Sequence, residues 1–143
     1  MKIIQPSGKE QWEQYYDLRY QVLRKPWNQP VSSTKDNAED ISVHLLMIND
    51  KGEAVAAGRL QLNSEIEGQI RSMAVRSDYQ GKGLGSAIVR YIEDIAKDRK
   101  LKYLVLDSRE NAVRFYVKNG YRVTGKSYLL FGMIQHYKMM KEL

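Results

Sequence analysis

The stretch RSDYQGKGLGSAIVRYIEDIAKDRK, residues 76–100, places three alternating glycines directly before a segment with helical periodicity. Apolar residues of that segment recur at i, i+3, i+4 and i+7, which predicts a strongly amphipathic helix. The first turn of a helix carries backbone N–H groups without intrahelical acceptors and a partial positive charge. Glycines ahead of such a turn let a ligand approach the backbone closely. The stretch therefore predicts an anion site suited to a pyrophosphate, and Lys82 adds charge to it.

Two common phosphate-binding fingerprints fit this stretch poorly. It has no Gly-Lys-Ser/Thr sequence, which closes a P-loop. The dinucleotide fingerprint fits better, because Ser86 stands where a third glycine belongs and Asp107 lies about 20 residues further on, where a ribose-binding acid is expected. However, residues 76–80 separate the first glycine from the preceding strand, where that fingerprint requires a tight turn. An antiparallel-looking meander also precedes the glycines, which argues against a dinucleotide site.

The rest of the chain shows a strand meander followed by strand–helix alternation. Ser7 and Glu10 have the spacing of a capping box ahead of a first helix, and Pro26 ends that helix. Gly58 marks a possible β-bulge, and residues 26–40 form a long polar loop. This order predicts an α/β (α+β) fold with one mixed sheet and helices on both faces. Strands are predicted at residues 2–5, 43–48, 54–62, 69–75, 103–106, 121–124 and 133–140, and further helices after Gly83 and at 111–118.

Composition narrows the class of protein. The 143 residues are 43% hydrophobic and 28% charged, which is typical of one globular domain, here residues 1–143. No apolar run approaches the roughly 20 residues of a membrane span, and without cysteine there is no disulfide or thiol nucleophile. We expect a cytoplasmic protein. The net charge of +6 suits nucleic acid or a phosphate-bearing small molecule, or simply a soluble surface.

The glycine stretch resembles motif A of the GNAT N-acetyltransferase superfamily, Gln/Arg-x-x-Gly-x-Gly/Ala, which reads Gln80-Gly81-Lys82-Gly83-Leu84-Gly85 here. SMAV, residues 72–75, resembles the strand before that motif, and ENAVRFYVKNGY, residues 110–121, resembles the second signature of the superfamily. The resemblance covers residues 69–124 well and the N-terminal half loosely. It implies a GNAT-type, mostly antiparallel sheet of about six to seven strands, and an acetyl-CoA-dependent N-acetyltransferase that needs no metal.

The resemblance also implies where acetyl-CoA binds. The pantetheine arm would pair with the edge of the strand at residues 73–75, as an added strand. Asn111 would lie near the pantetheine, although it could equally be a plain N-cap. The cofactor-binding residues implied are Met73, Ala74, Val75, Gln80, Gly81, Lys82, Gly83, Leu84, Gly85, Ser86 and Asn111.

In the reaction that the resemblance implies, an amine attacks the thioester directly and no covalent enzyme intermediate forms. Tyr116 matches the general acid of the superfamily, since a phenol stays protonated at neutral pH; its alternative role is that of a core aromatic. The N–H of Ala74 or Val75 would meet the oxyanion. His136, His44 or water could take the proton of the amine, and each histidine could instead have a hydrogen-bonded structural role in the sheet. His136 resembles the histidine of the Ile-Pro-His near the end of ElaA-like members, but Gln135 replaces the proline.

The acceptor side of the site is less well defined by sequence. Residues 18–30 resemble the acceptor-covering helix and loop of some superfamily members, so Arg24 and Trp27 could line the pocket, and Arg71 could face the acceptor. Arg19 falls on the apolar face of the first helix, where it either pairs with a buried acid or binds an acidic group of the substrate. Glu39 and Asp40 are expected to be solvated.

Two classes of function stay open at this stage. In the first, the acceptor is a small-molecule or peptide amine, and the protein is an enzyme that could form a homodimer. In the second, the protein is a non-catalytic module that senses CoA or binds nucleic acid. Nucleic acid is the less favoured partner, because the basic residues are scattered along the chain.

Overall fold

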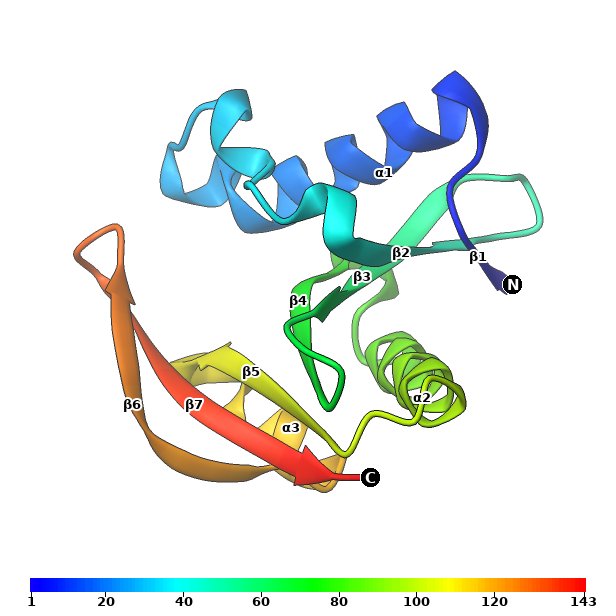
Figure 1. The fold of residues 1–143 in the computed structure, drawn as a ribbon. Coiled ribbons are helices and arrows are strands. Elements are labelled where there is room, and N and C mark those ends of the chain that lie inside the picture. The colour runs from blue at the N-terminus through cyan, green and yellow to red at the C-terminus, as the bar shows by residue number, and fades with distance from the viewer.

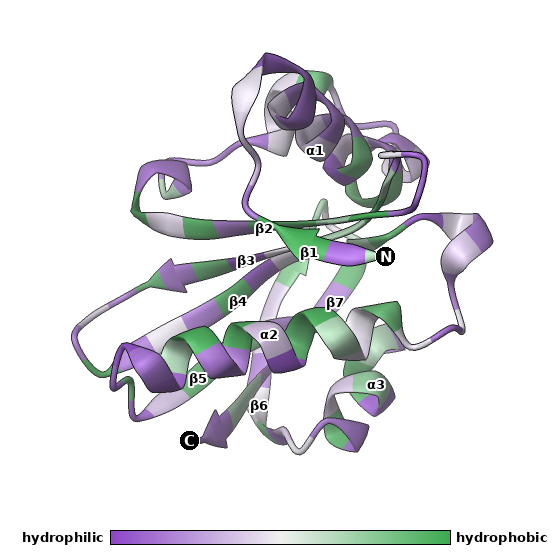
Figure 2. Cartoon of the chain, turned by 90° about the vertical axis from the view of Figure 1, so that its right-hand side faces the viewer, coloured by the Kyte–Doolittle hydropathy of each residue, from purple (hydrophilic) through white to green (hydrophobic).

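The computed structural model describes residues 1–143, which form a seven-stranded sheet of order β1-β2-β3-β4-β5-β7-β6. All neighbouring strands are antiparallel except β4 and β5, which are parallel. Helix α1 covers one face and helices α2 and α3 cover the other (Figures 1 and 2). This confirms the predicted mixed, mostly antiparallel sheet. The elements are β1 (Lys2–Ile4), α1 (Gly8–Leu23), β2 (Ser42–Ile48), β3 (Ala54–Leu62), β4 (Glu67–Val75), α2 (Leu84–Asp98), β5 (Tyr103–Arg109), α3 (Val113–Lys118), β6 (Arg122–Leu130) and β7 (Ile134–Glu142).

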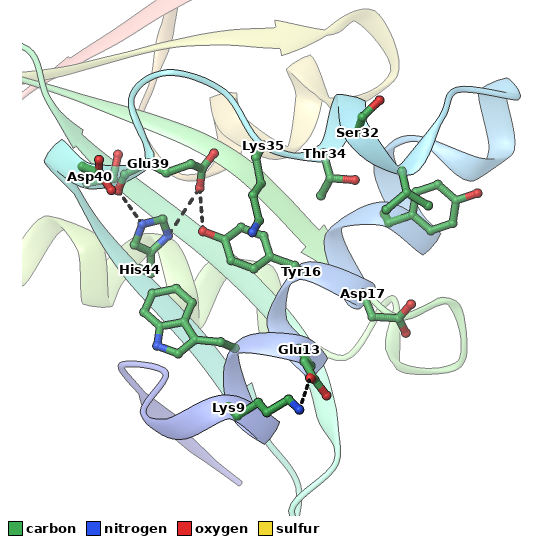
Figure 3. Close-up of a pocket in the computed structure, with 14 residues that line it drawn as sticks. Lys9, Glu13, Tyr16, Asp17, Ser32, Thr34, Lys35, Glu39, Asp40 and His44 are labelled. Carbon is green, nitrogen blue, oxygen red and sulfur yellow. Dashed lines mark hydrogen bonds and ion pairs between the residues drawn. The ribbon is translucent and has the colours of Figure 1, made fainter.

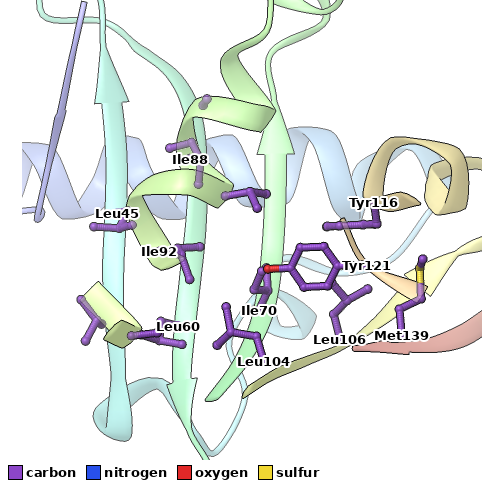
Figure 4. Packing of buried hydrophobic residues seen from close by; sticks show 14 of the residues in the cluster. Leu45, Leu60, Ile70, Ile88, Ile92, Leu104, Leu106, Tyr116, Tyr121 and Met139 are labelled. Carbon is purple, nitrogen blue, oxygen red and sulfur yellow. The ribbon is translucent and has the colours of Figure 1, made fainter. Parts of the chain in front are cut away.

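Helices on both faces of the sheet bury two apolar clusters. The larger cluster lies under α2 and α3, and its side chains include Leu45, Ile88 and Leu104 (Figure 4). The smaller cluster lies under α1 and includes Tyr15 and Leu46. Strand β2 is buried on both sides because its alternate side chains enter the two clusters, so its sequence from Leu45 to Ile48 is apolar at every position. The apolar stripe predicted for residues 84–96 is the buried face of α2.

A β-bulge bends β4 in its middle. Arg59 pairs with Arg71 and Ala57 pairs with Ala74, so Gly58 alone stands opposite Ser72 and Met73. The bulge predicted at Gly58 is therefore present, with the extra residue on β4. Ser72 has a φ of 55°, which is uncommon for a residue other than glycine and marks the bend.

The bend separates β4 from its parallel neighbour. Strands β4 and β5 are paired only from Glu67 to Gln69 on β4, opposite Tyr103 to Val105 on β5. Beyond that point they diverge, and the two groups of strands spread apart (Figure 1). Residues 70–75 of β4 consequently have one edge without a strand partner.

Several local predictions need correction. The Ser7 side chain makes no cap hydrogen bond; instead the Ser7 N–H donates to Gln11 Oε1 at 2.9 Å, so the capping box with Glu10 is wrong. Gly8, with a φ of 77°, delays the helical backbone by one residue, so Gln11 takes the position predicted for Glu10. Strand β6 extends six residues beyond its predicted end, and the helix predicted at 111–118 begins only at Val113. No helix is both long and apolar enough to cross a membrane.

Candidate active site

The glycine loop before α2 forms a cradle of free amides. Gly81 and Gly83 have φ values of 77° and 81°, which place them in the left-handed region that glycine adopts without strain. None of the backbone N–H groups from Gly81 to Ser86 has an acceptor in the protein. A Cβ built on Gly81 or Gly83 would meet nothing within 4 Å, so the space beside them is open. The cradle therefore has the free amides and the open space that an anion site needs, and its binding of a diphosphate stays a prediction.

Gly85 has a second role in this loop. A Cβ there would lie 3.1 Å from the ring of Phe115, so the glycine lets α3 approach the start of α2. Asn119 strengthens this contact, because its Nδ2 donates to Ser86 Oγ at 3.2 Å and to the Phe115 carbonyl at 2.9 Å. The cradle is thereby held against α3, which carries Tyr116.

The open edge of β4 continues from this cradle. The Arg76 N–H donates to the Val55 carbonyl at 2.9 Å, which sets the alternation of the β3–β4 ladder. Amides of successive residues in a strand point to opposite sides. The amide of Ala74 therefore points toward β3, like that of Arg76, and the amide of Val75 points away from β3. Gln80 Nε2 donates to the Val75 carbonyl at 3.1 Å, so the Val75 N–H is the group left free on the open edge.

A cavity of about 350 Å³ occupies the gap between β4 and β5. Five of the residues proposed from sequence line it, and they come from four different parts of the chain. They are Arg24, Arg71, Met73, Tyr116 and His136. The cavity is also lined by Leu23, Asp36, Gln69, Ile70, Ser72, Asp107, Ser108, Arg109, Ala112, Tyr128 and Leu130.

Tyr116 lies on α3 with its ring against Phe115 and Tyr121, at centroid distances of 4.9 and 6.0 Å. The side chain is buried in the larger cluster and also lines the cavity. No hydrogen bond holds its hydroxyl group. Burial raises the pKa of the phenol, so the group stays protonated well above neutral pH.

His136 lies on β7 opposite Arg109 of β5, and its ring stacks on Tyr128 with a centroid distance of 4.5 Å. Nδ1 lies 3.0 Å from the Ile134 carbonyl, so in the neutral ring it carries the proton and donates it to that oxygen. Burial lowers the pKa of the imidazole, which is therefore neutral at pH 7. The lone pair of Nε2 has no partner in the protein.

His44 lies elsewhere, under α1. Tyr15 Oη donates to its Nδ1 at 2.7 Å, and its Nε2 donates to the Glu39 carbonyl at 2.8 Å, so both ring nitrogens are engaged. It borders a larger, open cavity of about 1080 Å³ between α1 and the segment 31–44 (Figure 3). That cavity contains no residue of the glycine loop, of β4 or of α3.

Glu39 is half-buried and bound by two arginines, which corrects the expectation that it is solvated. Arg19 binds both of its oxygens, at 2.7 and 2.9 Å, and Arg59 binds it as well. Burial alone would raise the pKa of Glu39, but these hydrogen bonds and charges hold it well below its ordinary value. Arg19 thus pairs with a half-buried acid, which matches the first of the two roles that the sequence left open for it. Asp40 is exposed, as expected.

The remaining predicted residues lie at the border of the cavity or outside it. Arg71 donates to Gln61 Oε1 at 3.1 Å and lies 3.6 Å from Asp36. Trp27 does not line the cavity; its ring lies 6.0 Å from the Arg109 guanidinium. Asn111 is exposed in a 3-10 turn before α3, whose N-cap is Ala112.

Sequence reasoning missed Arg109 and Tyr128, and it considered Asp107 only as a ribose-binding acid. A signal for two of them exists in YLVLDSR, residues 103–109, where Leu104, Leu106 and Ser108 are buried and the alternate positions are not. Asp107 and Arg109 therefore share the other face of β5. They reach the cavity because β5 leaves β4 after Val105.

Comparison with known proteins agrees with this fold. The model of the acetyltransferase (GNAT) family matches residues 10–121. YjcF of Bacillus subtilis strain 168, described as an uncharacterized N-acetyltransferase, is 30% identical over 142 residues, with 99% of this chain and 100% of the relative covered. The chain therefore belongs to the acetyltransferase (GNAT) family. It is an acyltransferase with acetyl-CoA as its acyl donor.

Solved structures share the whole fold at lower sequence identity. A putative N-acetyltransferase from Lactobacillus plantarum superposes with a TM-score of 0.88 at 22% identity, covering 99% of this chain and 97% of the other. ElaA of Escherichia coli superposes with a TM-score of 0.82 at 19% identity, with the same coverage. These similarities confirm the GNAT-type architecture from β1 to β7.

Proposed function

We propose that this protein transfers the acetyl group of acetyl-CoA directly to an amine, without a covalent enzyme intermediate. One observation carries the proposal. The open edge of β4 connects the amide cradle of residues 81–86 with a cavity lined by a proton donor, Tyr116, and a proton acceptor, His136. Acetyl-CoA, when bound, supplies a thioester carbonyl that a neutral amine can attack.

The backbone positions the donor in this proposal. The free amides of residues 81–86 bind the diphosphate at the start of α2, and Lys82 adds a positive charge at the surface. Of the two amides predicted to meet the oxyanion, that of Val75 faces the open edge and that of Ala74 faces β3. Val75 is therefore the better hydrogen-bond donor toward the reacting carbonyl.

Two side chains move protons in this proposal. Tyr116 Oη gives its proton to the departing sulfur, a role for which burial keeps the phenol protonated. His136 Nε2 takes a proton from the acceptor ammonium, because its ring is neutral and its lone pair is free. His44 does not suit the second role, since both of its nitrogens are engaged and it borders another cavity. A cytoplasmic location and a homodimer stay predictions.

Replacing Tyr116 by phenylalanine tests the proposal. Release of free CoA thiol is measured with a panel of small primary amines, and CoA binding is measured by calorimetry. We expect kcat of Y116F to fall by about a hundredfold or more, as for loss of a general acid, with CoA affinity kept. Tyr91→Phe is the matched control, because Tyr91 is exposed on α2. Full turnover by Y116F would exclude the proton-donor role, and wild-type protein that releases no thiol with any amine would exclude the transfer.

A further inference from the structure

Two arginines without a carboxylate partner converge at one side of the cavity. Arg24 follows α1 directly, and Arg109 ends β5. Both donate to the carbonyl oxygen of Leu23, Arg24 Nη1 at 3.2 Å and Arg109 Nη2 at 3.0 Å. Arg24 Nε also donates to the Ser33 carbonyl at 3.0 Å. Neither guanidinium forms an ion pair with an aspartate or a glutamate.

Aromatic rings lie beside both guanidinium groups, and no carboxylate pairs with their positive charge. Arg24 lies 5.6 Å from the centre of the Phe131 ring, and Arg109 lies 6.0 Å from that of Trp27. Burial and then the charge of Arg19 lower the pKa of Arg24, while burial and then the charge of Arg24 lower that of Arg109. The carbonyl groups at the end of α1 offset only part of this cost.

The other buried arginines of this molecule show the contrast. Arg19 and Arg59 are almost fully buried, and both bind the carboxylate of Glu39. The fold thus supplies an acid where an arginine serves structure. It supplies none to Arg24 and Arg109, although holding two like charges in a partly buried site is costly. An anion that enters the cavity would remove that cost.

Two carboxylates line the cavity, those of Asp36 and Asp107, and neither pairs with Arg24 or Arg109. Asp36 is bound by Arg59, at 3.0 and 2.6 Å, and is not available to the arginine pair. Asp107 has only neutral partners, Ser127 Oγ at 2.7 Å and Gln69 Nε2 at 3.5 Å. Because Asp107 and Arg109 share one face of β5, a negative group and a positive pair lie on neighbouring positions of the cavity wall.

We propose that the acceptor is a small-molecule amine that also carries an anionic group, a carboxylate or a phosphate, and that Arg24 and Arg109 bind this group. The inference rests on the acetyl transfer proposed above. Such an acceptor lies between the two arginines and the open edge of β4. Asp107 faces its ammonium group. The cavity volume of about 350 Å³ suits a small molecule.

Matched pairs of acceptors test this inference. Thiol release is measured with α-amino acids against their amides, and with amino-alcohol phosphates against the parent amino alcohols, so that the two arms separate carboxylate from phosphate. We expect the wild type to prefer the anionic member of at least one set by roughly ten- to hundredfold in kcat/KM, as for loss of charge-assisted hydrogen bonds. Arg24→Gln and Arg109→Gln should lose that preference through a lower kcat/KM with the anionic member, and circular dichroism of both variants checks that they fold.

Arg122→Gln is the control, because Arg122 is exposed on β6 and pairs with Glu142 at the surface. It should keep the preference. Turnover without preference for the anionic member, or preference that survives in both cavity variants, would overturn the inference while leaving acetyl transfer intact. If no amine is turned over, the binding of an anion by the two arginines is tested by itself. The melting temperature of the CoA-saturated protein is then measured with and without inorganic phosphate. The wild type should then be stabilised and Arg24→Gln and Arg109→Gln should not, and an unshifted wild type would overturn the inference.

Discussion

At the scale of single residues, the two histidines of the chain differ in what they can do. Burial lowers the pKa of both. Both nitrogens of His44 are used in hydrogen bonds between β2, α1 and the segment before β2. His136 uses one nitrogen and keeps the other free beside the cavity. The same residue type thus serves structure at one site and is free for proton transfer at the other.

This difference predicts the pH dependence of the reaction. Because the pKa of His136 is lowered, the ring is neutral at pH 7 and becomes protonated, and so unable to accept a proton, only below its ordinary pKa of about 6.5. We expect kcat/KM to decline on the acid side below that value. His136→Gln should remove this decline and lower kcat/KM at pH 7.5 by about a hundredfold. His44→Gln should retain the decline, and a profile unchanged in His136→Gln would rule out His136 as the base.

At the scale of elements, the glycine loop depends on backbone conformation more than on side chains. Gly83→Ala would place a Cβ on a residue with a φ of 81°, at a cost of about 1 kcal/mol, and beside the diphosphate cradle. Gly52→Ala is a matched control, since Gly52 has a φ of 78° and the same open surroundings in the turn before β3. Both variants should melt at similarly lower temperatures.

Only Gly83→Ala should weaken binding of CoA, by about tenfold, because in the proposed site only that loop donates backbone hydrogen bonds to the ligand. Calorimetric titration of CoA compares the two variants. Equal loss of CoA affinity in both would show that strain, and not the cradle, explains the effect.

The elements also show which parts of the fold the sequence could predict. The amphipathic stripe of α2 and the glycines before it are local patterns, so both could be located from residues 76–100 alone. Strand β6 was predicted too short because it lies at the edge of the sheet and most of its side chains are exposed, which leaves no alternation of polar and apolar residues.

The acceptor side of the site depends on contacts that sequence spacing does not reveal. Arg24 and Arg109 meet because α1 ends, at Leu23, beside the end of β5, 86 positions away along the chain. Glu39 is half-buried because Arg19 of α1 and Arg59 of β3 both bind it. Such pairings are set by sheet order and register, so a sequence pattern could suggest that Arg19 needs an acid without showing which one.

At the scale of the whole molecule, the ion pairs of Glu39 with Arg19 and Arg59 join three parts of the chain. These parts are α1, β3 and the segment that precedes β2. The pKa of Glu39 in the folded protein is below its ordinary value, so its contribution to stability is present above the unfolded pKa and is lost as pH falls. We expect the free energy of unfolding to decline from about pH 5 downward. Urea denaturation at pH 7, 5 and 4 measures this decline.

Glu39→Gln should be less stable at pH 7 by roughly 3–5 kcal/mol, since buried Arg19 loses its only carboxylate and buried Arg59 keeps only Asp36. The stability of this variant should also vary less between pH 5 and 4. Glu13→Gln is the control, because Glu13 forms only an exposed pair with Lys9, at 3.9 Å. An equally steep acid dependence in Glu39→Gln would assign the effect to other carboxylates.

The short contact between β4 and β5 has a consequence for the lifetime of the protein. Only three residue pairs join β4 to β5. We therefore expect local opening of the fold to occur between these two strands. Acetyl-CoA bound along the open edge of β4 would contact both groups of strands. It would then stabilise the folded protein by mass action. We therefore expect proteases to cut the free protein sooner than the CoA-saturated protein, which limited proteolysis with and without CoA measures.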